Sequence, residues 1–313
     1  MLSRRNIRVK VMQVLYALSR KAPEDASVRA ANQYYQHLVN DSFKLYLFNL
    51  LAFVRVAEYA RQDKIRRSGK LRPSEQDLAF SAKLADNPLL QSLIKNYDLT
   101  NAHSKYKMGQ TLDADLIRKL YVDFSKEDAY QKYIYESGDS NEEHIAIYLE
   151  LYRFLINSET FGSMAEDHFP LWMDDKSLVV GAMKKTLKAL PVAGDFLNAY
   201  LPPDETVKEF GENLLHKVQD ADEELLSIIE PNLKNWDAER VAVLDMIILK
   251  MALAEFLYFS SIPTKVTLNE FVEISKLYST DKSKDFVNGI LDRLLKKLNE
   301  DGMIQKKGRG LKD

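Results

Sequence analysis

Residues 238–258 read AERVAVLDMIILKMALAEFLY, and this stretch decides the fold class. Apolar residues cover nearly the whole circumference of the helix that it predicts, a pattern typical of a central helix packed on several sides. Charged residues at Asp245, Lys250 and Glu255 make it too polar for a membrane span. We therefore expect a helical bundle built around this segment.

Two more predicted helices follow this segment. The first, KVTLNEFVEISKLYS, covers 265–279, and the second begins near Asp285. The residues expected on the buried side of the first are Val266, Phe271 and Ile274. The second has its apolar residues at Phe286, Ile290, Leu291, Leu294, Leu295 and Leu298. Helical spacing puts each set on one face, as expected for helices that pack on the central one.

The rest of the chain also predicts helices. Apolar residues recur at helical intervals in 4–20, 29–67, 74–86, 113–135, 141–157 and 175–190, whereas 96–112 is expected to be a loop. Glycine, with 11 residues, and proline, with 9, are scarce in a chain of 313, which argues against a strand-and-turn architecture. Tyrosine and phenylalanine residues from about 22 to 160 sit at helical spacing, so we interpret them as core rather than as base-stacking platforms. The predicted fold class is all-α.

Composition excludes several classes of function. The chain has no cysteine, its five histidines are spread singly, and it lacks phosphate-loop, dinucleotide-binding and zinc-protease motifs. We therefore expect no metal, no cofactor and no catalytic residues. No apolar run has the length of a signal peptide or a membrane span, which predicts a cytoplasmic protein without a membrane partner. The net charge of −2 means that any nucleic-acid contact must come from a local patch.

The amino terminus carries such a patch. Every charged residue before Glu24 is basic: Arg4, Arg5, Arg8, Lys10, Arg20 and Lys21. Cations at the start of a helix oppose its macrodipole, so helix stability alone does not favour them there. Arginine binds phosphate oxygens with its planar fork and stacks on unpaired bases, which makes this end a candidate RNA contact. The alternative is a basic terminus that is merely solvated.

Both ends of the chain resemble the NusB family. The stretches LKNWDAERVAVLDMIILKMALAEFLY, IPTKVTLNEFVEISKLYS and DFVNGILDRL follow the carboxyl-terminal half of that family in order. RRNIRVKVMQVLY resembles the family's opening, in which an arginine-rich run leads to a Gln-x-Leu-Tyr pattern, here Gln13, Leu15 and Tyr16. The resemblance implies a pair of helical bundles that perform no chemistry. It also implies binding of boxA-type RNA together with the ribosomal protein NusE, within the transcribing RNA polymerase complex.

By position, the resemblance implies a set of RNA-binding residues. These are Arg4, Arg5, Arg8, Lys10, Gln13, Lys284, Phe286 and Asn288. Asn6 and Val9 stand where better-known members have arginine and an acid, so the patch is diluted. Phe286 could instead be core, and Asn288 could be structural. We expect reversal of Arg4, Arg5 and Arg8 to glutamate to remove RNA binding without unfolding the protein.

The chain is more than twice as long as compact members of that family, and the extra material resembles the long form of the Bacteroidetes lineage. We expect residues 1–21 to form the arginine-rich helix and 22–160 an inserted helical subdomain. Residues 161–300 would complete the NusB-like bundle, and 301–313 would be a disordered basic tail. The inserted segment KIRRSGKLR, with five basic residues between 64 and 72, is either a solvated helix end or a second segment that binds phosphates.

Two other classes of protein are alternatives to an RNA-binding antitermination factor. Some rRNA methyltransferases carry a NusB-like domain, but their chemistry needs a cysteine nucleophile that is absent here, and too few residues follow the last helix for a cofactor domain. The remaining alternative is a helical protein–protein adaptor of the transcription machinery without its own RNA affinity. Salt-dependent RNA binding distinguishes an RNA-binding antitermination factor from such an adaptor.

Overall fold

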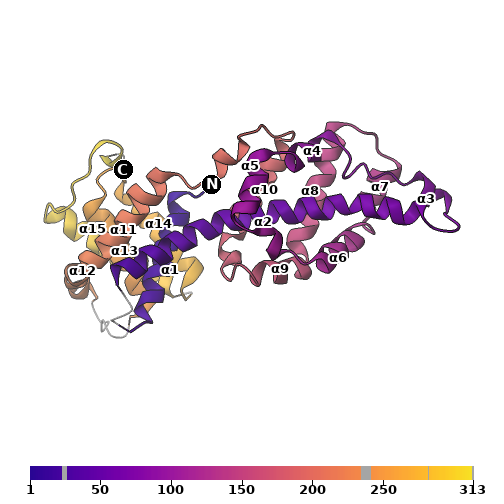
Figure 1. Ribbon diagram of the computed structural model, residues 1–313. Coiled ribbons are helices and arrows are strands. Elements are labelled where there is room, and N and C mark those ends of the chain that lie inside the picture. Colours follow the sequence, from indigo (N-terminus) through magenta and orange to yellow (C-terminus); the bar gives the residue numbers. More distant parts are fainter. Residues whose placement is uncertain (23–26, 234–240, 281, 312–313) are drawn as a thin grey trace. The chain divides into compact units, whose positions relative to one another are not determined.

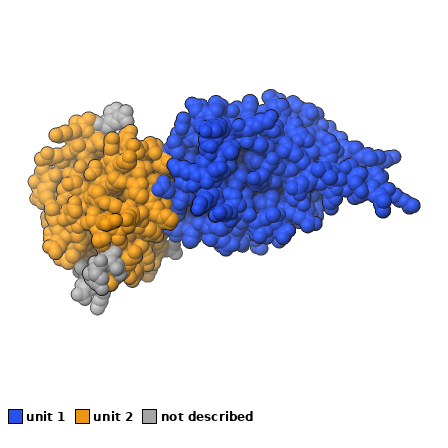
Figure 2. Space-filling view, viewed as in Figure 1, with its two compact units in different colours: residues 1, 40–201 blue, residues 2–39, 202–313 orange. Residues whose placement is uncertain are grey.

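The computed structural model describes residues 1–22, 27–233, 241–280 and 282–311. Its regular elements over those ranges are helices, without a strand, so the predicted all-α class is confirmed (Figure 1). The helices form two compact units (Figure 2). Unit 1 consists of Met1 and residues 40–201, and unit 2 consists of residues 2–39 and 202–313. The long helix α2 (Val28–Ser68) contributes residues to both units.

Unit 2 is built around helix α13 (Val243–Tyr258). Its other main elements are α1 (Arg4–Ser19), the π-helical segment η4 (Glu205–Glu212), α11 (Asn213–Asp220), α12 (Asp222–Ile229), α14 (Thr264–Tyr278) and α15 (Ser283–Glu300). Helices α1, α11, α12, α14 and α15 all pack against α13. Residues 247–249 and 251–256 of α13 are buried, which confirms the predicted central helix. The predicted residues 238–240 lie outside the described ranges.

Local sequence explains where α1 begins and how closely it packs. Ser3 caps the helix in a reciprocal capping box with Asn6, which satisfies amide groups at a terminus that has no acidic residue in its first turn. Val11 and Val14 are fully buried. Gly211 of η4 lies against Ile7 and the Tyr35 hydroxyl, where any larger residue would overlap them. Tyr35 in turn donates its hydroxyl proton to the Val207 carbonyl at 2.8 Å.

A buried carboxylate fixes the connection between α14 and α15. Asp245 of α13 accepts hydrogen bonds from the hydroxyls of Ser279 at 2.6 Å and Ser283 at 2.7 Å. Ser283 is the first residue of α15, and Asp245 is only 5% exposed. Because a buried carboxylate needs such partners, the two serines and Asp245 hold the start of α15 in one position.

Unit 1 surrounds the remainder of α2. Its helices are α3 (Glu75–Ala79), α4 (Pro88–Ile94), α5 (Tyr97–Lys105), α6 (Ala114–Phe124), α7 (Asp128–Tyr135), α8 (Asn141–Asn157), α9 (Glu159–Glu166) and α10 (Trp172–Lys188). Short 3-10 segments run over Met108–Thr111 and Phe196–Tyr200. Tyr46, Phe48, Phe53, Tyr148 and Tyr152 are fully buried among them. The interpretation as core is therefore confirmed for these five aromatics, whereas Tyr97 is 76% exposed.

The structure corrects several local predictions. The expected loop 96–112 contains α5, which Asn96 caps, and a 3-10 turn. The expected helix 74–86 ends at Ala79. Asn87 and Pro88 mark the start of the next helix, α4, because the Asn87 side chain accepts hydrogen bonds from the amides of Leu89 and Leu90. Val266, expected on the buried side of α14, is exposed.

The basic tail is ordered farther than predicted. The Lys306 ammonium group donates to the carbonyls of Glu255 and Phe259, and the Lys307 amide donates to the Ser260 carbonyl. The expectation of disorder is therefore wrong for this part, because these bonds satisfy carbonyls at the end of α13.

The boundaries of the two compact units differ from those of the predicted segments 22–160 and 161–300. Helices α9 and α10, which follow position 157, belong to unit 1, where α9 packs with α6 and α8, and α10 packs with α8. The insertion itself stays a prediction.

Candidate nucleic-acid interface

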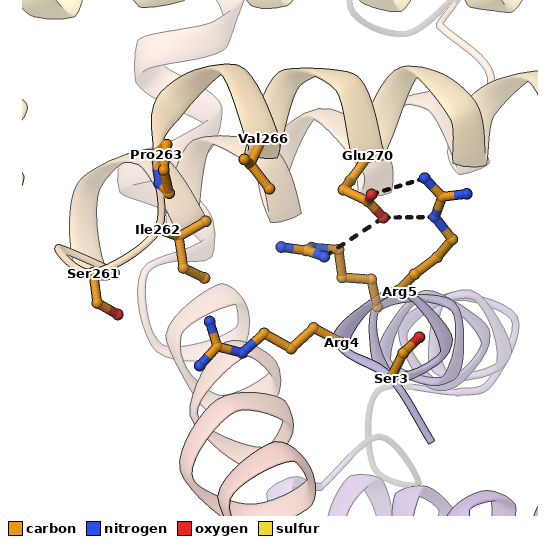
Figure 3. A pocket seen from close by; sticks show the side chains of 9 residues that line it. Ser3, Arg4, Arg5, Ser261, Ile262, Pro263, Val266 and Glu270 are labelled. Atoms are coloured by element: carbon orange, nitrogen blue, oxygen red, sulfur yellow. Dashed lines mark hydrogen bonds and ion pairs between the residues drawn. The ribbon is translucent and has the colours of Figure 1, made fainter. Parts of the chain in front are cut away.

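The first two turns of α1 and the start of α14 enclose an open hollow of about 700 Å³ within unit 2 (Figure 3). Its lining consists of Ser3, Arg4, Arg5, Arg8, Ser261, Ile262, Pro263, Val266 and Glu270. The three arginines that the sequence singled out therefore meet at one site. Helical spacing puts Arg4, Arg5 and Arg8 on one face of α1. Ile262, Pro263 and Val266 give the hollow an apolar wall.

Arg5 forms a two-pronged ion pair with Glu270 of α14. Its Nε lies 2.7 Å from Oε2 and its Nη2 lies 2.7 Å from Oε1. The Arg5 hydrogen bonds hold the pKa of Glu270 below its usual range, despite the partial burial of that carboxyl. The Arg5 side chain is nevertheless 50% exposed. A phosphate can therefore approach its guanidinium from solvent.

Arg8 is placed differently, because its side chain is only 3% exposed. It donates two hydrogen bonds to the fully buried Glu255 of α13, and its guanidinium lies over the rings of Phe210 and Phe271. The Thr267 hydroxyl donates a third bond to the Glu255 carboxylate at 2.6 Å. Arg8 therefore joins α1 to α13, and its Nη1 also lies 3.7 Å from Glu270 Oε2 of α14.

Arg4 is the least constrained of the three arginines. Its Nη2 lies 3.3 Å from Glu205 Oε1 of η4, and both side chains are substantially exposed. Its guanidinium also lies 5.5 Å from the centroid of the Phe210 ring. An exposed pair of this kind contributes little stability, so a stronger anion competes for Arg4 at low cost.

The other predicted residues of α1 do not reach the hollow. Lys10 is buried and Gln13 is half-buried, and neither lines it. On α15, Lys284 and Asn288 are exposed and Phe286 is half-buried, but none of these three lines the hollow either. The bonds from Ser279 and Ser283 to Asp245 fix the turn that precedes them.

Sequence reasoning missed the carboxylates that accompany the arginines. Glu205, Glu255 and Glu270 lie about 200 or more positions farther along the chain, so only the fold brings them to α1. For Glu255 the sequence does contain an indication, because an acidic residue inside an almost wholly apolar helix needs a buried partner. With three arginines and three glutamates, the site is close to neutral, and its cationic character resides in the exposed groups of Arg4 and Arg5.

Within the described ranges, no three histidine, aspartate or glutamate residues are grouped so that they could hold a metal ion. Among the helices of those ranges, none combines the length and apolar character needed to cross a membrane. The exposed guanidinium groups of Arg4 and Arg5 in the hollow suit the binding of an anion.

The chain matches the family model described as "NusB family" over residues 181–296. It is 40% identical over 111 residues to "Transcription antitermination protein NusB" of Salinibacter ruber, which is 36% of this chain and 69% of that protein. It is 42% identical over 101 residues to the protein of the same name from Chloroherpeton thalassium, covering 32% and 46% of the two chains. It is 40% identical over 96 residues to the protein of the same name from Natranaerobius thermophilus, which is 31% of this chain and 64% of that protein. No solved structure gives a significant match.

Proposed function

Because this chain belongs to the NusB family, we propose that it is a cytoplasmic, non-catalytic transcription antitermination factor that binds boxA-type RNA together with the ribosomal protein NusE. In this proposal the two proteins act on RNA within the transcribing RNA polymerase complex. The observation that carries the proposal is the pair of exposed guanidinium groups, from Arg4 and Arg5, at the mouth of one hollow.

The proposed RNA contacts fall into two groups. Arg4 and Arg5 bind phosphate oxygens, and the RNA exchanges places with the carboxylates of Glu205 and Glu270. Lys284 and Asn288, exposed on α15, and the half-buried Phe286 provide the second group.

Arg8, Lys10 and Gln13 are assigned a supporting role. Direct contact by Arg8 would require its guanidinium to leave a fully buried carboxylate, which costs several kcal/mol. Reversal of Arg8 to glutamate would also place two acids side by side in the interior. The triple reversal expected from the sequence to spare the fold is therefore replaced, as a test, by reversal of Arg4 and Arg5 alone.

The test measures binding of a boxA-type RNA to the full chain, with and without NusE, by fluorescence anisotropy at two salt concentrations. We expect NusE to tighten binding, and Arg4→Glu with Arg5→Glu to weaken it at least tenfold. A plot of log affinity against log salt concentration should have a slope about 1.4 smaller in magnitude for this double variant than for the wild type. That is the change expected when two phosphate contacts to a single strand are lost. The matched control reverses Arg118 and Lys119, two exposed cations of α6. Equal weakening in both variants would contradict the assignment.

The adaptor without RNA affinity remains the second candidate. One observation favours it, namely that Glu205, Glu255 and Glu270 balance the charges of the three arginines. In the same experiment an adaptor would bind NusE but show no salt-sensitive affinity for RNA.

A further inference from the structure

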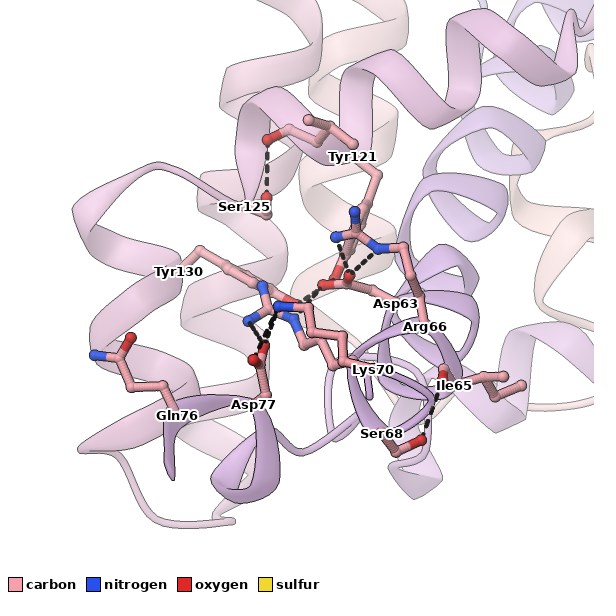
Figure 4. Close-up of polar contacts among 12 residues, drawn as sticks. Asp63, Ile65, Arg66, Ser68, Lys70, Gln76, Asp77, Tyr121, Ser125 and Tyr130 are labelled. Atoms are coloured by element: carbon pink, nitrogen blue, oxygen red, sulfur yellow. Dashed lines mark hydrogen bonds and ion pairs between the residues drawn. The ribbon is translucent and has the colours of Figure 1, made fainter. Parts of the chain in front are cut away.

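The end of α2 and the turn that leads into α3 form a second charged surface, within unit 1 (Figure 4). We call residues 64–78 the α2–α3 tip. It contains the basic residues Lys64, Arg66, Arg67, Lys70 and Arg72. It also carries three large aliphatic side chains that are about two-thirds or more exposed, Ile65 at 71%, Leu71 at 104% and Leu78 at 68%. Exposed apolar residues gathered in a short segment are typical of an interaction surface.

The tip is held in place by a polar network around Asp63. This nearly buried carboxylate accepts hydrogen bonds from Arg66 at 2.6 Å, from Arg67 at 2.9 Å and from the Tyr121 hydroxyl at 3.1 Å. The Tyr121 hydroxyl is also bonded to that of Tyr130 at 2.9 Å. The arginine bonds keep the pKa of Asp63 low although burial opposes this. The end of α2 is therefore fixed to α6 and α7.

A second carboxylate fixes the turn after α2. Asp77 accepts two hydrogen bonds from the Lys70 ammonium group, at 2.8 and 2.9 Å, and one from the Ser74 amide at 3.0 Å. Arg67 contributes to both carboxylates, since its Nη1 lies 3.5 Å from Asp77, and it lies over the Phe80 ring at 4.5 Å. The tip is thus ordered before any partner binds. Binding to an ordered surface loses less conformational entropy than binding to a flexible one.

The charges of the tip indicate what it binds. Arg66, Arg67 and Lys70 are already paired with Asp63 and Asp77, whereas Lys64 and Arg72 have no acidic partner among the described residues. The tip, residues 64–78, contains five basic and two acidic residues, a net charge of +3, which the adjacent buried Asp63 reduces to +2. Strong RNA binding would favour unpaired cations and aromatic stacking groups, but the exposed apolar side chains here are aliphatic. An acidic protein segment with apolar residues fits better.

We propose that the α2–α3 tip docks an acidic amphipathic segment of a partner protein. Ile65, Leu71 and Leu78 enter the apolar face of that segment, and Lys64 and Arg72 lie beside its carboxylates. Burial of the aliphatic side chains supplies affinity through the hydrophobic effect, and the two cations set the orientation of the bound segment. This interaction is independent of the proposed RNA contacts of Arg4 and Arg5, since it uses residues of unit 1 only.

The test uses the full chain and a synthetic helical peptide with glutamates on one face and leucines on the other. Binding is followed by fluorescence anisotropy. We expect Leu71→Ser with Leu78→Ser, and separately Lys64→Glu with Arg72→Glu, to weaken peptide binding at least tenfold. All four side chains are exposed, so the variants should keep their fold. Leu277→Ser, at an equally exposed leucine of α14, is the matched control.

A second peptide with the same charges and serine in place of leucine should not bind. Equal peptide affinity of the wild type and the tip variants would overturn the proposal. The proposal would also be overturned if the double variant Lys64→Glu with Arg72→Glu lost binding of boxA-type RNA but kept its peptide affinity. That result would assign the tip to nucleic acid. Concentration-dependent self-association in sedimentation that the leucine variants abolish would instead identify a second copy of this chain as the occupant and overturn it too.

Discussion

Arg8 and Glu255 form a doubly hydrogen-bonded ion pair in the interior of unit 2. Arg8 Nε lies 2.8 Å from Glu255 Oε2, and Arg8 Nη2 lies 2.7 Å from Glu255 Oε1. The side chains are 3% and 0% exposed. Each charge is costly to bury alone, so each depends on the other for its place. The pair therefore fixes α1, which carries Arg4 and Arg5, to the central helix.

Glu255→Gln should destabilise the protein by about 3 kcal/mol, because it leaves the buried Arg8 guanidinium without its main counter-charge. Urea unfolding followed by circular dichroism measures the free energy of unfolding. Glu300→Gln, at an exposed glutamate in the last turn of α15, is the control and should change little. The double variant Arg8→Met with Glu255→Leu should be less destabilised than Glu255→Gln alone. Equal stability of Glu255→Gln and the control would contradict the structural role of the pair.

Gly211→Ala should be destabilising by about 1–3 kcal/mol, because the added methyl group would overlap the Tyr35 hydroxyl and lie 2.5 Å from Ile7 Cγ2. These neighbours belong to α2 and α1, so the strain would spread to the helix that carries the arginines. The matched control is Gly162→Ala in α9, where an added Cβ has no neighbour within 4 Å. That change should stabilise by about 0.5–1 kcal/mol through helix propensity. Thermal melts in which both variants shift in the same direction would refute the prediction.

Helices α1, α13, α14 and α15 of unit 2 were predictable from the sequence, whereas η4, α11 and α12 were not among the predicted helices. The apolar runs of α13, α14 and α15 and the basic start of α1 gave element types and approximate bounds, because helical periodicity is a local property. Polar caps were harder to interpret. The sequence pattern predicts a helix stop at Asn87 and the start of a loop at Asn96, whereas the side chains of both residues cap the first amides of α4 and α5.

The candidate site was predictable only in part. The clustering of Arg4, Arg5 and Arg8 follows from their spacing on one helix. Their carboxylate partners could not be predicted, because Glu205, Glu255 and Glu270 reach α1 only through the tertiary fold. For the same reason the burial of Arg8, in contrast to the exposure of Arg4 and Arg5, could not be predicted from the sequence.

Leu253→Asp should destabilise the protein by several kcal/mol, because Leu253 is fully buried in the middle of α13 and the new carboxylate would lack a partner. Leu277→Asp introduces the same charge at an exposed leucine of α14 and should stay within about 0.5 kcal/mol of the wild type. Thermal unfolding of the two variants beside the wild type measures the difference. A wild-type melting temperature for Leu253→Asp would contradict the position of α13 in the core.

His103 should make the stability of unit 1 depend on pH. Burial lowers the pKa of His103 to about 4, and its Nε2 donates a hydrogen bond to the Leu47 carbonyl at 3.2 Å. In the unfolded chain the pKa of histidine is about 6.5. Between these two values the unfolded state binds a proton that the folded state does not. The stabilising contribution is therefore complete above pH 6.5 and declines as the pH falls towards 4, by at most about 1.4 kcal/mol per pH unit.

Urea unfolding at pH 7.5, 6.5 and 5.0 measures this decline. His103→Gln keeps a donor for the Leu47 carbonyl but cannot be protonated, so its stability should fall less than that of the wild type, by a difference of about 2 kcal/mol at pH 5.0. His168→Gln removes an exposed histidine of the same unit and should follow the wild-type curve. If His103→Gln and the wild type lose stability in parallel, His103 is not the group that is protonated on unfolding, and the decline must come from other residues.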